Sequence, residues 1–273
     1  MFTTAGVHSL RKAATDHVRA AADSKTTYGK EFSRLAYGLG ENEFLQTVCK
    51  SNIFRKAIVE LTGSPLLMAD AQAFELEKGK TGFAWHYDSL SFRFIRPEDA
   101  GYSLWIPLDK ICAESTGGGM AYVSESVLSA HMNFQLSNLL STRLVSGQSI
   151  SSISLPLASI FETPSLLTSL MEENKEEDSF EPGDAFFFRK TVWHRSSPLT
   201  TQAPSSRLAI VIRFLDWRSR FDKVMYEGEF DTGGGVGMGM DWGKPKQATY
   251  GSQFIDVEHG DEIRTSRFCG PLI

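Results

Sequence analysis

Cysteine is scarce in this sequence, which has three in 273 residues, at Cys49, Cys112 and Cys269. Their number is odd and they lie far apart, so they provide neither a disulfide framework nor the closely spaced pairs of a cysteine-based zinc site. This usage is typical of proteins in a reducing compartment. We therefore expect a cytoplasmic protein.

Long apolar runs and an excess of positive charge are also missing. No stretch is long enough to cross a bilayer, and Met1-Phe2-Thr3-Thr4 does not begin a basic segment followed by an apolar one. Lys and Arg number 28 against 33 Asp and Glu, which gives a net charge of −5 and a pI near 5.7. We expect neither a nucleic-acid nor a membrane partner. The glycine-rich stretch 233–239 lacks the Lys-Ser/Thr of a phosphate-binding loop, so we interpret it as an ordinary loop.

The chain is long enough to bury a full core, with 41% hydrophobic residues. We expect one domain over 1–273, in which 1–64 forms a helical layer, 65–220 the core and 221–273 a tail. Apolar residues recur at three- and four-residue steps over 7–22, which predicts a helix. Shorter helices are predicted over 41–48 and 52–61, with Ser51 as an N-cap and Gly63 and Pro65 ending the second.

From Pro65 onward, short segments rich in aromatic and β-branched residues alternate with turn signals. This organisation is typical of a sandwich or barrel, the jelly roll included. The segment 124–178 reads as an insertion at the barrel mouth, where such segments often serve as lids. Its acidic run, 172–178, is interpreted as a solvated helix end or loop. The predicted strands are 66–76, 83–94, 102–108, 118–123, 185–188 and 207–215.

Two histidines and an aspartate stand out as metal-ligand candidates. His86 and Asp88 are one residue apart in an aromatic run, and His194 ends a second apolar run far downstream. Two imidazoles and one carboxylate form the facial triad of non-haem Fe(II) oxygenases. If 83–94 is a strand, His86 and Asp88 point to the same side. His194 would then arrive from an antiparallel neighbour.

Several motifs follow one another along the chain: Trp85-His86-Tyr87-Asp88, the stretches 104–109, 114–123 and 180–188, and His194-Arg195-Ser196 followed by Arg207. Their order resembles the phytanoyl-CoA dioxygenase-like (PhyH-type) family of Fe(II)/2-oxoglutarate oxygenases. The similarity extends over roughly 72–215, and Arg195 stands where the family usually has glycine. The resemblance implies a double-stranded β-helix, that is, a cupin-like jelly roll, which uses Fe(II), 2-oxoglutarate and O2.

The far carboxylate of 2-oxoglutarate needs a fixed cation, for which a guanidinium is well shaped. Arg207 is our candidate, and Arg213 is the rival. Ser196 is expected to donate a hydrogen bond to that carboxylate and Trp105 to wall the cosubstrate site, although a turn residue and core filler are the alternatives.

The candidate substrate contacts are Arg93, Arg96 and Tyr87, with solvated arginines as the alternative for the first two. The resemblance implies hydroxylation of an unactivated carbon of a small molecule, an amino acid or a natural-product intermediate. Desaturation, epoxidation or ring formation is the alternative within the class, and a cupin-like binding protein without turnover is the alternative outside it. Halogenases of the superfamily have Gly or Ala at the carboxylate position, whereas this sequence has Asp88. The oligomeric state is left open.

Overall fold

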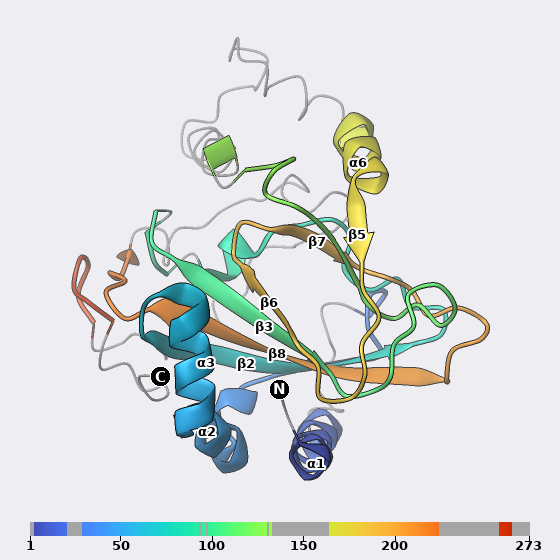
Figure 1. Cartoon of the computed structure of the whole chain (residues 1–273), viewed down its shortest axis with the longest axis horizontal. Helices are drawn as coiled ribbons and strands as arrows, with labels where there is room; N and C mark the ends of the chain where they lie inside the picture. The colour runs from blue at the N-terminus through green and yellow to red at the C-terminus, as the bar shows by residue number, and fades with distance from the viewer. Residues whose placement is uncertain are drawn as a thin grey trace.

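The computed structural model of the chain describes residues 3–20, 29–92, 94–96, 98–129, 131–132, 164–223 and 257–263. The glycine-rich stretch 233–239 and most of the insertion lie outside them. The strands of the described part form two antiparallel sheets (Figure 1). No helix in it is both long and apolar enough to cross a lipid bilayer.

The larger sheet has the strand order β1-β2-β8-β3-β6. Its central pair, β2 and β8, runs antiparallel over almost its whole length, from Leu66 opposite Asp216 to Glu77 opposite Ser206. The smaller sheet has the order β5-β4-β7. The larger sheet is formed by β1 (Arg34–Tyr37), β2 (Leu66–Glu77), β3 (Gly101–Pro107), β6 (Phe186–Arg189) and β8 (Ser206–Asp216), and the smaller by β4 (Met120–Val123), β5 (Lys175–Glu177) and β7 (Trp193–Ser196).

Helices α1 (Thr4–Ala20), α2 (Glu43–Lys50) and α3 (Asn52–Thr62) cover one face of the larger sheet (Figure 1). The predicted caps of α3 are confirmed, because Ser51 accepts a hydrogen bond from the Phe54 N–H and Gly63 adopts a left-handed φ of 71°. Short 3₁₀ helices lie at Leu39–Glu41 (η1) and Asp88–Phe92 (η2), and α6 (Pro164–Glu173) precedes β5.

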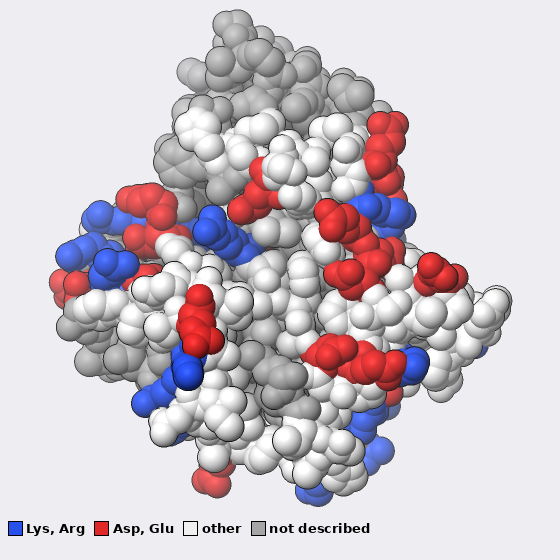
Figure 2. Space-filling model, viewed as in Figure 1, with Lys and Arg blue, Asp and Glu red and all other residues white. Residues whose placement is uncertain are grey.

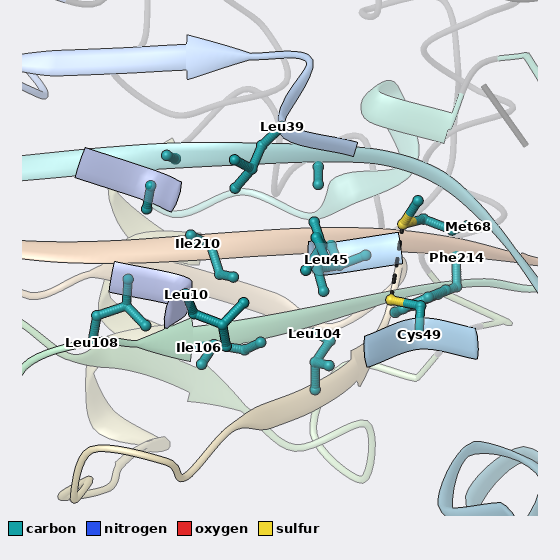
Figure 3. Packing of buried hydrophobic residues seen from close by; sticks show 14 of the residues in the cluster. Leu10, Leu39, Leu45, Cys49, Met68, Leu104, Ile106, Leu108, Ile210 and Phe214 are labelled. Carbon is teal, nitrogen blue, oxygen red and sulfur yellow. Dashed lines mark hydrogen bonds between the residues drawn. The ribbon is translucent and has the colours of Figure 1, made fainter. Parts of the chain in front are cut away.

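Alternation along β8 separates two environments. Leu208, Ile210, Ile212 and Phe214 point to the helices and join the largest apolar cluster. Figure 3 shows how this cluster packs, with Cys49 of α2 beside Met68 of β2. Each large apolar side chain that it buries contributes about 1.5–3 kcal/mol. Residues of the other parity face the smaller sheet, as Arg207, Ala209, Val211 and Arg213 do, and these positions are therefore available for a site between the sheets.

A bulge in β2 changes which residues reach that inner face. The register of β2 against β8 shifts between Met68 and Asp70. Met68 packs in the helix-side cluster, whereas Asp70 forms an ion pair with Arg213 on the inner side. The extra residue of the bulge thus turns a carboxylate toward the site.

Several predicted elements differ from those observed. The segment 83–94 is not one strand, because only His86 forms a bridge and the 3₁₀ helix η2 begins at Asp88. The region 1–64 is not purely helical, since β1 pairs with β2. The acidic run 172–178 includes the end of α6, as predicted, and also the strand β5. Figure 2 shows acidic side chains gathered where Figure 1 places β5, which agrees with a solvated run.

The described ends of the insertion pack on the outer face of the smaller sheet. Leu128 and Met171 join a cluster with Ala121, Val123 and Trp193, away from the larger sheet. The described part of 221–273 also packs, because Val257 and Ile263 join a cluster with residues of β2 and β8.

Candidate metal centre

Two of the three predicted ligands face each other across an antiparallel bridge. The His86 N–H donates to the His194 carbonyl at 2.9 Å, and the His194 N–H donates to the His86 carbonyl at 2.8 Å. Their ring centroids are 4.2 Å apart. The expectation that His194 arrives from an antiparallel neighbour is confirmed.

The backbone also sets which ring nitrogen of each histidine carries the proton. His86 Nδ1 lies 2.7 Å from the Ala84 carbonyl, and His194 Nδ1 lies 3.0 Å from the Val192 carbonyl. A carbonyl only accepts, so each Nδ1 holds the proton and each Nε2 keeps its lone pair. Both Nε2 atoms are thereby prepared as ligands, each by a carbonyl two residues earlier.

Asp88 reaches the histidines by a different route from the predicted one. It is the first residue of η2, not a strand residue, so the alternation argument for the pair His86 and Asp88 is wrong. The carboxylate nevertheless lies close: Asp88 Oδ1 is 3.8 Å from His86 Nε2 and 3.9 Å from His194 Nε2. The tight 3₁₀ turn after Tyr87, and not the strand pleat, directs the carboxylate toward the rings.

Two groups on the larger sheet hold the Asp88 carboxylate. The Ser103 hydroxyl donates to Asp88 Oδ2 at 2.6 Å, and the Arg213 guanidinium lies 3.8 Å from Asp88 Oδ1. Burial would raise the pKa of Asp88, but Arg213, the two histidines and the Ser103 hydrogen bond lower this pKa to about 2. Asp88 is therefore a carboxylate at neutral pH, with Oδ2 engaged and Oδ1 directed at the imidazoles.

The donor set fits a divalent metal ion. One ligand atom from each of His86, Asp88 and His194 lies within 4.8 Å of the others, and all three residues are buried. Burial lowers the pKa of His86 to about 3, with the adjacent His194 adding to the effect, and burial also lowers the pKa of His194. Neutral imidazoles and an ionised carboxylate are the forms that bind metal.

Arg207 occupies the inner face of β8 six residues before Arg213. It is 3% exposed, and its Nε donates to the Gly118 carbonyl at 2.7 Å. Its guanidinium carbon lies 5.3 Å from the centroid of the Trp105 ring. Gly118 has a φ of 78°, and a Cβ there would lie 2.6 Å from Leu199 Cδ2, so the turn that brings this carbonyl to Arg207 requires glycine.

The two inner arginines of β8 have different partners. Arg213 forms ion pairs with Asp70 and Asp88. Arg207 forms no ion pair within the described ranges. Burial lowers the pKa of Arg207 to about 10, with Asp109 opposing, so the group stays charged at neutral pH. A buried charge without a counter-ion costs several kcal/mol, which favours an anionic ligand at Arg207.

Ser196 lies on β7 beside the histidine pair. Its hydroxyl accepts a hydrogen bond from the Phe83 N–H at 3.1 Å, and its own N–H donates to the Phe83 carbonyl at 2.9 Å. The hydroxyl proton is still available to a ligand. The structure thus gives Ser196 a structural contact and leaves its expected donor function possible.

Two of the three expected substrate contacts, Arg96 and Tyr87, lie within the described residues. Arg93 lies outside the described residues. Arg96 is half-buried, and its carbonyl accepts a hydrogen bond from the Lys190 amine at 3.2 Å. Tyr87 is 3% exposed and packs edge-on against Trp193, at 4.8 Å between ring centroids, in the outer cluster. This packing gives no support to a substrate contact at Tyr87, because the ring is committed to the face opposite the histidine side chains.

Sequence reasoning missed Ser103 and the role of Asp70. Ser103 lies two residues before Trp105 on the same strand, so alternation places it on the inner face, and that signal was available. Asp70 gave no such signal, because it reaches the inner face only through the bulge.

The two facing sheets and the buried His-Asp-His group define a jelly-roll protein of the non-haem iron oxygenase class. Residues 3–209, more than half of the chain, match the family described as phytanoyl-CoA dioxygenase (PhyH). The chain belongs to this family, whose members are Fe(II)/2-oxoglutarate-dependent oxygenases. No curated protein matches the sequence significantly.

Solved structures share the fold. SnoK, a non-heme α-ketoglutarate-dependent carbocyclase from nogalamycin biosynthesis, has a TM-score of 0.57 at 16% identity over 81% of this chain and 79% of SnoK. EctD from S. alaskensis with bound Fe has a TM-score of 0.56 at 14% identity over 82% of this chain and 73% of EctD. EctD with 2-oxoglutarate and 5-hydroxyectoine has a TM-score of 0.55 at 15% identity, over 95% and 81%.

Proposed function

We propose that this protein hydroxylates an unactivated carbon of a small molecule, an amino acid or a natural-product intermediate, in an Fe(II)/2-oxoglutarate-dependent reaction. The observation that supports it best is the convergence of two histidine Nε2 atoms, whose rings carry their protons on Nδ1, and one carboxylate oxygen at a buried point between the sheets. Three protein ligands leave coordination positions open, as a reaction centre requires and a closed structural site does not.

His86, Asp88 and His194 would hold the ion. Bound iron, with 2-oxoglutarate and O2, supplies the oxidising power that removes hydrogen from an unactivated C–H bond as 2-oxoglutarate is decarboxylated to succinate. The chain's own residues prepare this chemistry. The carbonyls of Ala84 and Val192 fix both tautomers, and Ser103 engages one carboxylate oxygen so that the other is presented to the ion.

We assign Arg207 as the anchor for the far carboxylate of 2-oxoglutarate. Its buried guanidinium has no acidic partner among the described residues, and Nε is already oriented by Gly118. The remaining N–H groups suit a carboxylate. Trp105 lies against the guanidinium and would wall the cosubstrate, and Ser196 would add a hydroxyl donor.

Desaturation, epoxidation or ring formation would use the same residues, so product analysis separates these outcomes from hydroxylation. Solved structures that share this fold include a carbocyclase, SnoK, and an epimerase, SnoN. A binding protein without turnover is disfavoured by Arg207, since a pure metal binder has no need of a buried cation at that place. We further propose a cytoplasmic protein that acts as a single domain, with Arg93 and Arg96 as candidate contacts to an acidic group of the substrate.

Anaerobic titration with Fe(II) and 2-oxoglutarate tests the proposal. The wild-type protein is expected to develop the weak visible charge-transfer band of chelated cosubstrate. His86→Ala, Asp88→Ala and His194→Ala should each abolish this band while the melting curve stays cooperative. Succinate release against a panel of amino acids, acyl thioesters and terpenoids then identifies the substrate class. A His194→Ala variant that keeps both band and activity would show that the ligand assignment is wrong.

A further inference from the structure

Glu172 lies at the end of α6, on the outer face of the smaller sheet, and touches residues next to two of the three metal-ligand candidates. Its neighbour Met171 is fully buried in the cluster that packs on this face. The Glu172 carboxylate thus lies on the outer face of the smaller sheet, whereas the side chains of His86 and His194 lie on its inner face.

Three donors converge on the Glu172 carboxylate. Arg195 binds it with two nitrogens, Nε to Oε1 at 2.8 Å and Nη2 to Oε2 at 3.1 Å. The Trp85 indole N–H donates to Oε1 at 2.8 Å, and the Lys175 amine donates to Oε2 at 2.8 Å. The Arg195 guanidinium carbon also lies 5.3 Å from the centroid of the Trp85 ring.

The two main partners of Glu172 adjoin the ligand histidines in the chain. Trp85 immediately precedes His86, and Arg195 immediately follows His194. In extended segments successive side chains point to opposite faces, so His86 and His194 point inward while Trp85 and Arg195 point outward. The backbones of His86 and His194 are joined by their reciprocal hydrogen bonds. One carboxylate therefore ties the two segments together from behind.

We propose that Glu172, through Arg195 and Trp85, is a positioning residue that fixes the relative placement of His86 and His194 for metal binding. This inference rests on the proposed function. Glu172, Arg195 and Trp85 together are called the clamp. The clamp also links the end of the insertion 124–178 to the metal centre.

An ordinary surface ion pair contributes little to stability, because solvent screens it, and would be too weak to fix the position of a neighbouring ligand. The clamp differs from an ordinary surface ion pair in its geometry. The Arg195 side chain is only 16% exposed, its contact with Glu172 is bidentate, and the indole N–H fixes the same carboxylate from a second strand segment. The Arg195 hydrogen bond is the main reason that the pKa of Glu172 is lowered to about 2, so the clamp is charged at every pH at which the protein would act.

The test is Co(II) binding to the full-length protein, measured by calorimetry and by the visible absorption of the bound ion, which reports coordination geometry. Glu172→Ala and Arg195→Gly should each weaken Co(II) binding about three- to tenfold, below the roughly 10–100-fold typical of groups bonded directly to a ligand. Each should also alter the Co(II) spectrum. Trp85→Phe, which keeps an aromatic ring but replaces the indole and so removes its N–H, should show a smaller loss in the same direction.

Glu173→Gln is the matched control, because Glu173 is the exposed neighbour on the same helix and its side chain makes no hydrogen bond or ion pair with the described residues. It should leave Co(II) affinity and spectrum unchanged. If Glu172→Ala and Arg195→Gly lower only the melting temperature while Co(II) affinity and spectrum match the wild type, the clamp is merely structural and the inference is wrong, although the proposed function stands. A wild type that binds Co(II) no better than His194→Ala would instead overturn both, since there would be no metal centre to position.

Discussion

Arg207 and Arg213 lie on the same face of β8, yet among the described residues only Arg213 forms ion pairs with carboxylates. Arg213 lies 3.6 Å from Asp70 Oδ2 and 3.8 Å from Asp88 Oδ1. Arg207 instead bonds a backbone carbonyl and lies over Trp105. The two residues are about 20 Å apart along an extended strand at its usual rise per residue. Arg213 therefore pairs with the candidate metal-ligand carboxylate, which agrees with our proposal that Arg207 is the anchor for the cosubstrate.

Arg207→Ala should raise the 2-oxoglutarate requirement strongly, because loss of a desolvated charge-assisted contact costs about 2–5 kcal/mol. Arg213→Ala should change the 2-oxoglutarate affinity much less and weaken metal binding instead, since Asp88 loses its cation. Titration of 2-oxoglutarate into the Fe(II)-loaded variants measures the first effect, and Co(II) calorimetry measures the second. The opposite ranking for 2-oxoglutarate would transfer the anchor to Arg213.

Ser103→Ala should weaken metal binding about 10–100-fold, because the hydroxyl bonds a metal-ligand carboxylate directly. Asp88 Oδ2 would lose a hydrogen bond to a charged group, worth about 1.5–3 kcal/mol. Co(II) calorimetry is the measurement.

Ser64→Ala is a matched control for Ser103→Ala. Ser64 makes the same kind of bond, to Asp216 Oδ2 at 2.7 Å, but without a metal-ligand candidate. Ser64→Ala should lower the stability of the fold and leave the Co(II) affinity unchanged. Equal Co(II) affinities for the two variants would show that Ser103 does not contribute to metal binding.

Gly82→Ala should destabilise the fold and disturb the ligand histidines. Gly82 has a φ of 65°, and a Cβ there would lie 2.2 Å from Ser196 Cβ, where Phe83 pairs with Ser196 next to the histidine bridge. Gly79→Ala provides the comparison, because its φ is 86° but nothing lies within 4 Å of the added Cβ.

Gly79→Ala should therefore cost about 1–2 kcal/mol, which is the left-handed strain alone, whereas Gly82→Ala should cost more and also lower Co(II) affinity. Urea denaturation gives the stabilities. Equal losses of stability would mean that the close approach of Gly82 and Ser196 is unimportant.

The long strands of the larger sheet could be predicted from the sequence. Predicted strands 66–76, 102–108 and 207–215 differ from β2, β3 and β8 by one residue at each end at most. These strands are long, and residues that favour turns mark their ends in the sequence. The site was predictable as a set of three residues, because residue type and order point to it.

The turn at Asp88 could not be predicted in the same way. The run 83–94 is rich in aromatic residues before and after Asp88, and no Gly or Pro marks the 3₁₀ helix within it. Its aromatic residues serve different clusters, since Trp85 and Tyr87 pack on the outer side and Phe92 and Phe94 pack near β2. Because the segments before and after Asp88 have similar composition, the sequence does not reveal that the chain changes direction between them. Strand β5 was missed for a related reason, because its Lys and Glu residues gain their extended form by pairing with β4.

The last prediction concerns the product in the presence of halide. Asp88 is buried, its Oδ2 is held by Ser103, and its Oδ1 faces both Nε2 atoms, so under the proposed ligand assignment a carboxylate would occupy the metal position that a halide needs. We therefore expect an oxygenated or desaturated product and no chlorinated one, even at high chloride. Mass spectrometry of turnover in chloride and in bromide reads the result from the isotope pattern.

Asp88→Gly removes the carboxylate and should abolish hydroxylation. It should also open room for chloride, although halogen transfer further requires that the substrate carbon lie nearer to the halide than to the oxygen. Ser103 and Arg213 would then surround the vacated position with a hydroxyl donor and a cation, both of which suit an anion. Chloride binding to this variant is measured by its effect on the Co(II) spectrum. A halogenated product from the wild-type protein would show that Asp88 is not a ligand, because a bound carboxylate and a halide would compete for one position.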